Sequence, residues 1–112
     1  MLSSILIGVG MATVDMERMR EAAGTATAVL RALANEDRLL LLCQLSQGEH
    51  SVGELELQLD IRQPTLSQQL GVLRKEGLVD TRREGKYIYY AVADPKVLAL
   101  LKTLYSLYCP KG

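Results

Sequence analysis

The sequence has no tryptophan or phenylalanine, a single histidine, two cysteines and no net charge at neutral pH. Without large apolar rings, the core of this 112-residue chain must be filled by Leu, Val and Ile, and the length suits a single domain. Nucleophilic hydrolysis usually needs a nucleophile, a histidine base and an acidic group that orients it. His50 has no suitable acidic neighbour, and we therefore predict that the chain is not an enzyme.

Long hydrophobic runs are also missing, since none reaches the roughly 20 residues that a membrane-spanning helix needs. The opening MLSSILIGVGMATV is apolar but lacks the basic leader and cleavage site of a secretory signal. We therefore expect an N-terminal extension over residues 1–14 and a single folded domain over residues 15–112. The expected location is cytoplasmic, with no membrane partner.

Although the total charge is zero, the basic residues are concentrated in one segment of the chain. Between residues 62 and 86, the acidic side chains Glu76, Asp80 and Glu84 are outnumbered by basic ones, namely Arg62, Arg74, Lys75, Arg82, Arg83 and Lys86. Residues 49–60 carry acidic side chains and no lysine or arginine. A local basic segment of this kind indicates a polyanionic partner despite the neutral total.

Apolar periodicity and capping residues predict five helices and one hairpin. Asn35, Ser51 and Asp94 are expected to cap helices, with Glu54 completing a capping box after Ser51. Pro64 suits the first position of the fourth helix, and a turn at Glu84-Gly85 joins two strands. The predicted helices span 15–33, 36–47, 52–59, 64–76 and 95–109, and the predicted strands span 78–83 and 86–92.

This order predicts a mainly α fold with a small β-hairpin (α+β), arranged as a winged helix-turn-helix. The first helix carries an apolar seam at steps of three and four, made of Met16, Met19, Ala23, Ala26, Leu30 and Leu33. The last helix is apolar on nearly every side, which requires burial on more than one face. We therefore expect a homodimer through the first and last helices; packing of the seam on the chain's own core is the alternative.

The polar face of the fourth helix is the main candidate for reading bases. It comprises Gln63, Thr65, Ser67, Gln68 and Gln69, opposite Leu66, Leu70 and Leu73. In a helix-turn-helix, amides and hydroxyls at this position meet base edges in the major groove. The predicted partner is double-stranded DNA with a near-palindromic operator; an ordinary solvated helix face is the alternative.

Flanking cations are expected to contact phosphates. They are Arg62 before the helix, Arg74 and Lys75 at its end, and Arg82, Arg83 and Lys86 at the hairpin tip. The hairpin charges could instead only prevent pairing between exposed strand edges. We expect Tyr90 and Ile88 in the core and Tyr87 near the sugar-phosphate backbone.

The run QPTLSQQLGVLRKEGLVDTRREGKYIYY resembles the helix-turn-helix and wing of the ArsR/SmtB family of bacterial repressors. The likeness extends over roughly Val29 to Cys109, and Leu-x-x-Leu-Arg-Lys-x-Gly-Leu-Val is its most specific part. Together with Cys43 and Cys109, the segment SVGELELQLDIRQPTLSQQLGVLR resembles the sulfide-responsive subgroup of that family. This resemblance implies derepression when two cysteines react with reactive sulfur species.

The sensing group is expected to be a thiol pair and not a metal. The helix after Ser51 has no cysteine, the last helix has no histidine, and His50 is expected alone on a loop. A closed site of four nitrogen or sulfur ligands therefore cannot be built, and we predict no metal and no cofactor. A metal-responsive repressor of the same fold and a protein-interaction module remain alternatives, as does a purely structural role for each cysteine.

Overall fold

The computed structural model describes residues 15–109, and its contacts divide the chain into one unit up to Leu30 and another from Arg31 onward. The predicted extension, residues 1–14, and Pro110 lie outside the described residues. Helix α2 (Met16–Leu33) begins one residue after its predicted start at residue 15, and the Asp15 carboxylate accepts a hydrogen bond of 2.9 Å from the Glu17 backbone N–H in the first turn. Most of the predicted apolar seam of α2 is exposed, including Met16 and Leu30.

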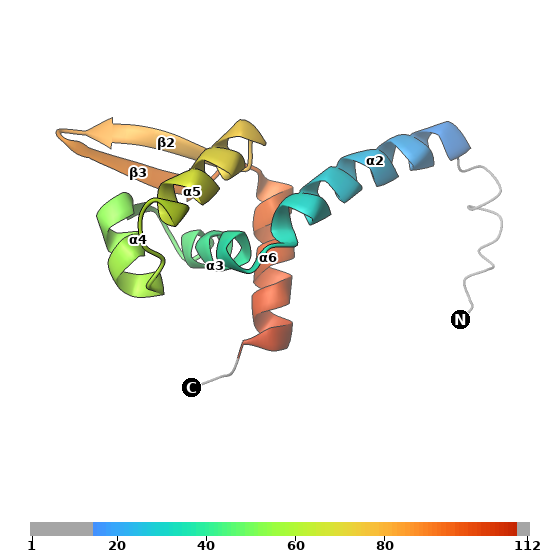
Figure 1. Ribbon diagram of the computed structural model, residues 1–112. Helices are drawn as coiled ribbons and strands as arrows, with labels where there is room; N and C mark the ends of the chain where they lie inside the picture. Colours follow the sequence, from blue (N-terminus) through green and yellow to red (C-terminus); the bar gives the residue numbers. More distant parts are fainter. Residues whose placement is uncertain (1–14, 110–112) are drawn as a thin grey trace. The chain divides into compact units, whose positions relative to one another are not determined.

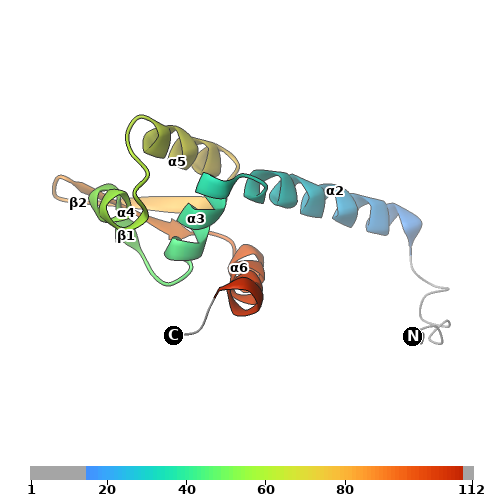
Figure 2. The same cartoon turned by 60° about the horizontal axis from the view of Figure 1, so that its bottom comes forward.

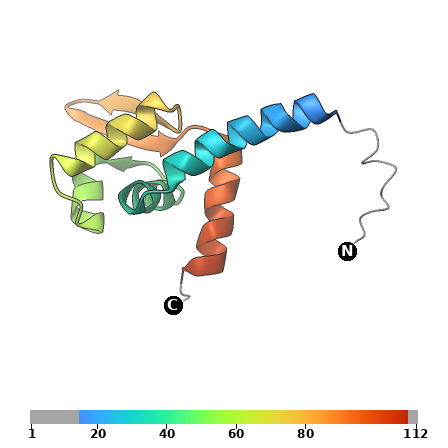
Figure 3. The same ribbon diagram turned by 45° about the vertical axis from the view of Figure 1, so that its right-hand side comes forward.

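The second unit is organised around helix α3. Its remaining elements are α3 (Glu36–Leu45), β1 (His50–Ser51), α4 (Val52–Leu59), α5 (Thr65–Lys75), β2 (Val79–Glu84), β3 (Tyr87–Val92) and α6 (Pro95–Tyr108). Helix α3 contacts α4, α5, α6 and β3. Figures 1 and 3 show it between α6 on one side and the α4–α5 pair on the other, and Figure 2 repeats this arrangement from a third direction. Helix α3 therefore packs against both α6 and the α4–α5 pair.

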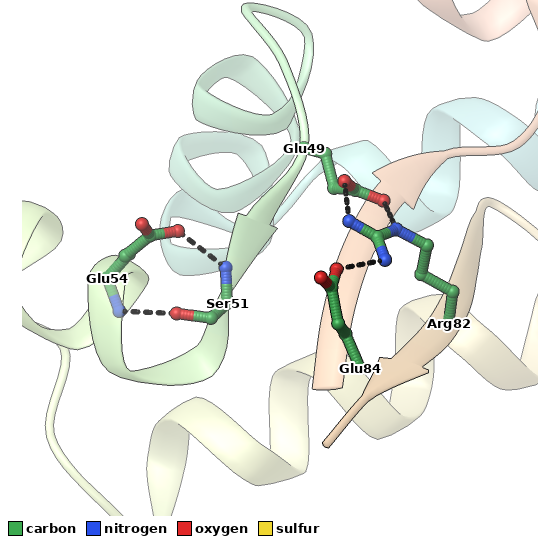
Figure 4. A network of polar contacts seen from close by, with 5 residues as sticks. All are labelled: Glu49, Ser51, Glu54, Arg82 and Glu84. Atoms are coloured by element: carbon green, nitrogen blue, oxygen red, sulfur yellow. Dashed lines mark hydrogen bonds and ion pairs between the residues drawn. The ribbon is translucent and has the colours of Figure 1, made fainter. Parts of the chain in front are cut away.

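Side-chain caps fix the starts of three helices, as the sequence predicts. Asn35 accepts a hydrogen bond of 3.0 Å from the backbone N–H three residues on, and Asp94 accepts one of 2.8 Å at the start of α6. Ser51 and Glu54 form the expected capping box, with bonds of 3.2 and 2.8 Å (Figure 4). Each cap satisfies a backbone donor that has no partner within its helix.

The sheet has three antiparallel strands in the order β1-β3-β2. In the hairpin, Glu84 pairs with Tyr87, and the turn therefore consists of Gly85 and Lys86, one residue later than predicted. The positive φ of Gly85, 63°, suits the first position of such a turn. The hairpin is the wing of the fold, and its strands run out from the body of the second unit (Figure 1).

Strand β1 was not predicted. It places His50 opposite Tyr90 and Ser51 opposite Tyr89, so the expectation that His50 lies on a loop was wrong. Two residues carry no detectable alternation of apolar and polar side chains, and only the register of β3 reveals such a strand.

The core is aliphatic, as the lack of large aromatic residues requires. Its most buried side chains are Leu41, Leu42, Leu55, Leu66, Leu70, Leu73 and Leu101. They belong to α3, α4, α5 and α6, so one cluster joins the four helices. Helices α4 and α5, the turn between them and the wing form a winged helix-turn-helix. Among the described residues, no helix has the length and apolar character required to cross a membrane.

Candidate nucleic-acid interface and cysteine pocket

The turn between α4 and α5 sets the direction of the candidate reading helix. Asp60 ends α4 in the left-handed conformation, with φ 55° and ψ 35°, and Ile61 after it is buried. An aspartate adopts this conformation at lower cost than most residues, because its short side chain tolerates it. The buried Ile61 then anchors the turn on the core and fixes where α5 begins.

The buried stripe of α5 is the predicted one, with Leu66, Leu70 and Leu73 between 0 and 1% exposed. Ser67 and Gln68 are exposed, and Thr65 is half-buried at the first position of the helix. The exposed surface of α5 therefore offers hydroxyl and amide groups near its N-terminus. Its basic residues, Arg74 and Lys75, lie in the last turn, where they also suit the helix dipole.

Two of the glutamines on the predicted reading face already have partners inside the chain. The side-chain oxygen of Gln63 accepts a hydrogen bond of 3.1 Å from the Ser67 backbone N–H, which gives α5 a cap that Pro64 cannot supply. The side-chain oxygen of Gln69 accepts one of 3.0 Å from Arg38 Nη1. Gln69 is half-buried and ties α5 to α3, so its predicted place on the exposed face was wrong.

The sequence patterns did not predict that Arg38 holds helices together. Its Nε also donates to the backbone oxygen of Ala32 at 2.7 Å, so one guanidinium joins the end of α2, α3 and α5. The position of Gln69 in the sequence could have indicated this contact. Gln69 lies three residues after Leu66 and four before Leu73, which places it on the edge of the buried stripe.

At the wing, Arg82 is bound to two carboxylates, although we predicted a contact with phosphate. Its Nε and Nη2 donate to both oxygens of Glu49 at 2.7 and 2.9 Å, and its Nη1 donates to Glu84 at 2.7 Å (Figure 4). The guanidinium also lies 4.8 Å from the centre of the Tyr89 ring. The hydrogen bond from Arg82 lowers the pKa of Glu49. The bonds that Arg82 donates, first to Glu49 and then to Glu84, raise the pKa of Arg82. No local pattern could predict this ion pair, because Glu49 and Arg82 are 33 positions apart.

The other basic side chains predicted to contact phosphate at the turn and at the wing are exposed, and no described acidic side chain neutralises them. Within residues 15–109, no carboxylate forms an ion pair with Arg62, Arg83 or Lys86. Lys86 Nζ lies 5.7 Å from the centre of the Tyr87 ring, and Tyr87 is itself 54% exposed. The wing therefore presents two unpaired cations and one exposed ring at its tip. Ile88 is 37% exposed, so its expected place in the core was wrong, whereas Tyr90 is half-buried.

Cys43 and Cys109 line one pocket of about 440 Å³ between α3 and α6. Both are free thiols and both are half-buried. The remaining lining residues are Glu36, Leu39, Leu40, Leu104, Tyr105 and Tyr108. Burial in this apolar surrounding raises the pKa of the Cys43 thiol, and the negative charge that Cys109 can carry raises it further. The two cysteines that we predicted to act as a pair therefore line the same pocket.

No cluster of three or more histidine, cysteine or acidic side chains with the spacing of a metal site occurs among residues 15–109. Leu107 and Tyr108 at the end of α6 are 69 and 79% exposed. Together with Met16 and Leu30 of α2, they leave large apolar side chains uncovered on both helices assigned to the dimer.

Comparisons with known proteins agree with this architecture. A family model described as "Bacterial regulatory protein, arsR family" matches residues 35–81. A biofilm growth-associated repressor of Agrobacterium fabrum is 53% identical over 96 residues, which cover 86% of this chain and 82% of the relative. The crystal structure of the transcriptional repressor BigR from Xylella fastidiosa superposes with a TM-score of 0.78 at 46% identity, covering 88% of this chain and 100% of that one.

A third match concerns assembly. The solution structure of a homodimeric winged helix-turn-helix DNA-binding domain from Mycobacterium bovis, a possible ArsR-family transcriptional regulator, superposes with a TM-score of 0.70. It is 32% identical, and the match covers 85% of this chain and 88% of that one.

Proposed function

Because this chain belongs to the ArsR family and is a DNA-binding transcriptional regulator, we propose that it is a homodimeric repressor that reactive sulfur species release from its operator. The observation that carries the proposal is the pocket that Cys43 and Cys109 share between α3 and α6. Helix α3 also packs on both helices of the helix-turn-helix, so chemistry in the pocket acts on an element next to the candidate reading helix.

In this proposal α5 enters the major groove. Thr65, Ser67 and Gln68 read base edges, and a glutamine amide suits the paired donor and acceptor of adenine. Gln63 contributes its remaining amide N–H groups, since its oxygen caps α5. Phosphates are contacted by Arg62, Arg83 and Lys86. Arg82 also contacts phosphate after phosphate has displaced its two carboxylate partners.

The homodimer forms through α2 and α6, whose exposed apolar side chains need a cover that the described part of one chain does not supply. The homodimeric Mycobacterium bovis domain supports this assembly. A twofold dimer presents two α5 helices to successive major grooves, about 34–36 Å apart, and therefore requires a near-palindromic operator.

Release follows from a covalent link between the two thiols. A disulfide, or a chain of added sulfur atoms, would tie Cys109 at the end of α6 to Cys43 in α3. This link changes the packing between the dimer helix and the helix behind the reading head. Even a small change of the separation between the two α5 helices breaks their match to the groove spacing.

The test begins with selection and sequencing of the DNA that the reduced protein retains. The selected site is then titrated before and after treatment with a sulfane-sulfur donor, while intact mass is followed. We expect a cross-link between Cys43 and Cys109 that carries added sulfur, loss of DNA binding, and recovery with dithiothreitol. Cys43→Ser and Cys109→Ser should each bind DNA and fail to respond. A full response in either single variant would contradict the two-thiol mechanism.

The reading face is tested separately. Gln68→Ala should cost roughly 1–3 kcal/mol on the selected site and little on random DNA. Arg83→Ala should weaken binding to both DNAs and flatten the dependence on salt by about one unit per protomer. If Gln68→Ala leaves the preference for the selected site intact, α5 does not read bases through this residue.

A further inference from the structure

The pocket between α3 and α6 is an apolar site with acid at its edge. Its residues on α3 follow the spacing of one helix face, at Glu36, Leu39, Leu40 and Cys43. Leucine and tyrosine side chains of α6 complete the wall, and nearly all of the exposed lining is apolar. Its volume of about 440 Å³ falls in the range of roughly 300–1,000 Å³ typical of small-molecule sites.

The charges of the lining are one-sided. Glu36 is the charged residue among those that line the pocket, and no lysine or arginine is among them. An anion that enters an apolar site loses its hydration and needs a compensating cation or hydrogen-bond donors. Here it would instead meet the carboxylate of Glu36, whereas an uncharged molecule with apolar substituents would replace water along the leucine and tyrosine walls.

From this lining we infer that the pocket selects an uncharged organic polysulfide, such as a trisulfide with apolar substituents, over anionic sulfur donors. The inference deepens the proposed function and rests on it, because it names the class of donor that reaches the two thiols. The substituents occupy the apolar wall and hold the sulfur chain beside Cys43 and Cys109.

The chemistry needs no further reactant. One cysteine thiolate attacks the central sulfur of R–S–S–S–R, which forms a protein trisulfide Cys–S–S–S–R and expels RS⁻. The thiolate of the second cysteine then attacks the same sulfur atom and expels the other RS⁻, leaving Cys–S–S–S–Cys. Both thiol protons end on the two RSH products. The two cysteines are oxidised, and the donor is reduced to two thiols.

The experiment compares two trisulfides with the same aromatic body, dibenzyl trisulfide and its analogue with a para-carboxylate on each ring. Loss of free thiol in the reduced protein is measured for each donor and divided by the rate of that donor with N-acetylcysteine. We expect the neutral donor to react at least about tenfold faster on this relative scale, since the anionic donor must desolvate its charges beside Glu36. Mass spectrometry should find the Cys43–Cys109 trisulfide, and the operator should be released.

Glu36→Gln isolates the charge effect. It should raise the relative rate of the anionic donor and leave that of the neutral donor unchanged. Asp37→Asn is the matched control: it removes the same charge from the first turn of α3, but Asp37 does not line the pocket, and we expect the wild-type ratio. Equal relative rates for the two donors in the wild-type protein would overturn the inference while leaving the proposed function intact. If neither donor yields a cross-link or releases DNA, the inference fails, and the proposed function fails with it only if the sulfane-sulfur donor also leaves the operator bound.

Discussion

At the wing, Arg82 holds two carboxylates that a DNA phosphate would have to replace. The bidentate contact with Glu49 and the single contact with Glu84 neutralise the one wing cation that is not free in this structure. Because the hydrogen bond from Arg82 lowers its pKa, Glu49 is ionised at neutral pH and can compete with phosphate for Arg82.

Glu49→Gln should therefore strengthen DNA binding. The variant removes the charge that holds Arg82, so Arg82 is free to contact phosphate and the salt dependence should steepen by up to about one unit per protomer. The measurement is Kd on random and selected DNA across a range of salt. Glu84→Gln is the control and should have a smaller effect, because it loses one hydrogen bond and not two. Weaker binding by Glu49→Gln would show that the pair holds the wing in place for DNA.

The raised pKa of Cys43 gives a second prediction at this scale. At neutral pH the thiol is mostly protonated, so its reaction rate should rise about tenfold per pH unit between pH 7 and 8.5. The rate should approach its plateau only above the pKa of an ordinary thiol. Cys109→Ser removes the smaller of the two causes and should lower the pKa of Cys43, which burial still keeps above the ordinary value. Alkylation with monobromobimane across pH measures both profiles; a midpoint below that of a free thiol would contradict the prediction.

Single residues mark the limit of what the sequence could predict. The polar face with Ser67 and Gln68 follows from helical spacing, and the proposal that Cys43 and Cys109 form a sensing pair follows from resemblance. The partners of Arg82 could not be found in this way, because Glu49 belongs to a different part of the chain and approaches only when the sheet forms. Local patterns determine which face of an element is polar, but not which distant side chain comes to lie against it.

Among the elements, α5 contains a glycine without a structural purpose in the described part of the chain. Gly71 lies in the middle of the helix, and a Cβ placed on it would meet nothing within 4 Å. It follows Gln68 by three residues and precedes Lys75 by four, so it lies on the same outward face. Glycine in a helix interior costs roughly 0.5–1 kcal/mol relative to alanine. A close approach of DNA to the helix would account for its presence.

Gly71→Ala should accordingly raise the free energy of unfolding by roughly 0.5–1 kcal/mol and weaken binding to the selected DNA. Thermal or urea unfolding measures the first effect and a titration the second. Gly53→Ala is the control, since Gly53 lies in α4, outside α5 and both dimer helices, and also has open space around it. It should stabilise the protein without weakening DNA binding. If Gly71→Ala binds DNA as tightly as the wild type, the glycine is not a point of close approach.

Elements with strong caps were predicted almost to the residue. Asn35, Ser51 and Asp94 begin their helices as expected, and α3 ends at Leu45, two residues before the predicted end. The hairpin turn shifted by one residue, because both Glu84-Gly85 and Gly85-Lys86 place a glycine where positive φ is needed. Only the pairing of Glu84 with Tyr87 decides between them.

At the scale of the whole molecule, the main prediction is that the chain forms a homodimer through α2 and α6. Leu107 is 69% exposed and does not line the cysteine pocket, so a charge there should leave the single chain folded. Leu107→Glu should convert the dimer of twice 12.4 kDa into a folded monomer with much weaker operator binding. Light scattering and circular dichroism measure the two properties. Ser106→Glu, at the exposed neighbouring position, should remain dimeric. A wild-type chain that is a folded monomer at micromolar concentration would exclude the dimer altogether.

Both thiols of the pocket come from one polypeptide, so genetic complementation can distinguish a pair within one subunit from a pair shared between subunits. A cell that carries one copy with Cys43→Ser and another with Cys109→Ser makes mixed dimers in which every protomer still has only half of its pair. No exchange of subunits can restore a complete pair, so the two alleles should fail to complement each other. The strain should keep its target genes silent in the presence of the sulfur donor. If the paired cysteines had been contributed by different subunits, half of the mixed dimers' sites would have been whole, and the same cross would have recovered induction.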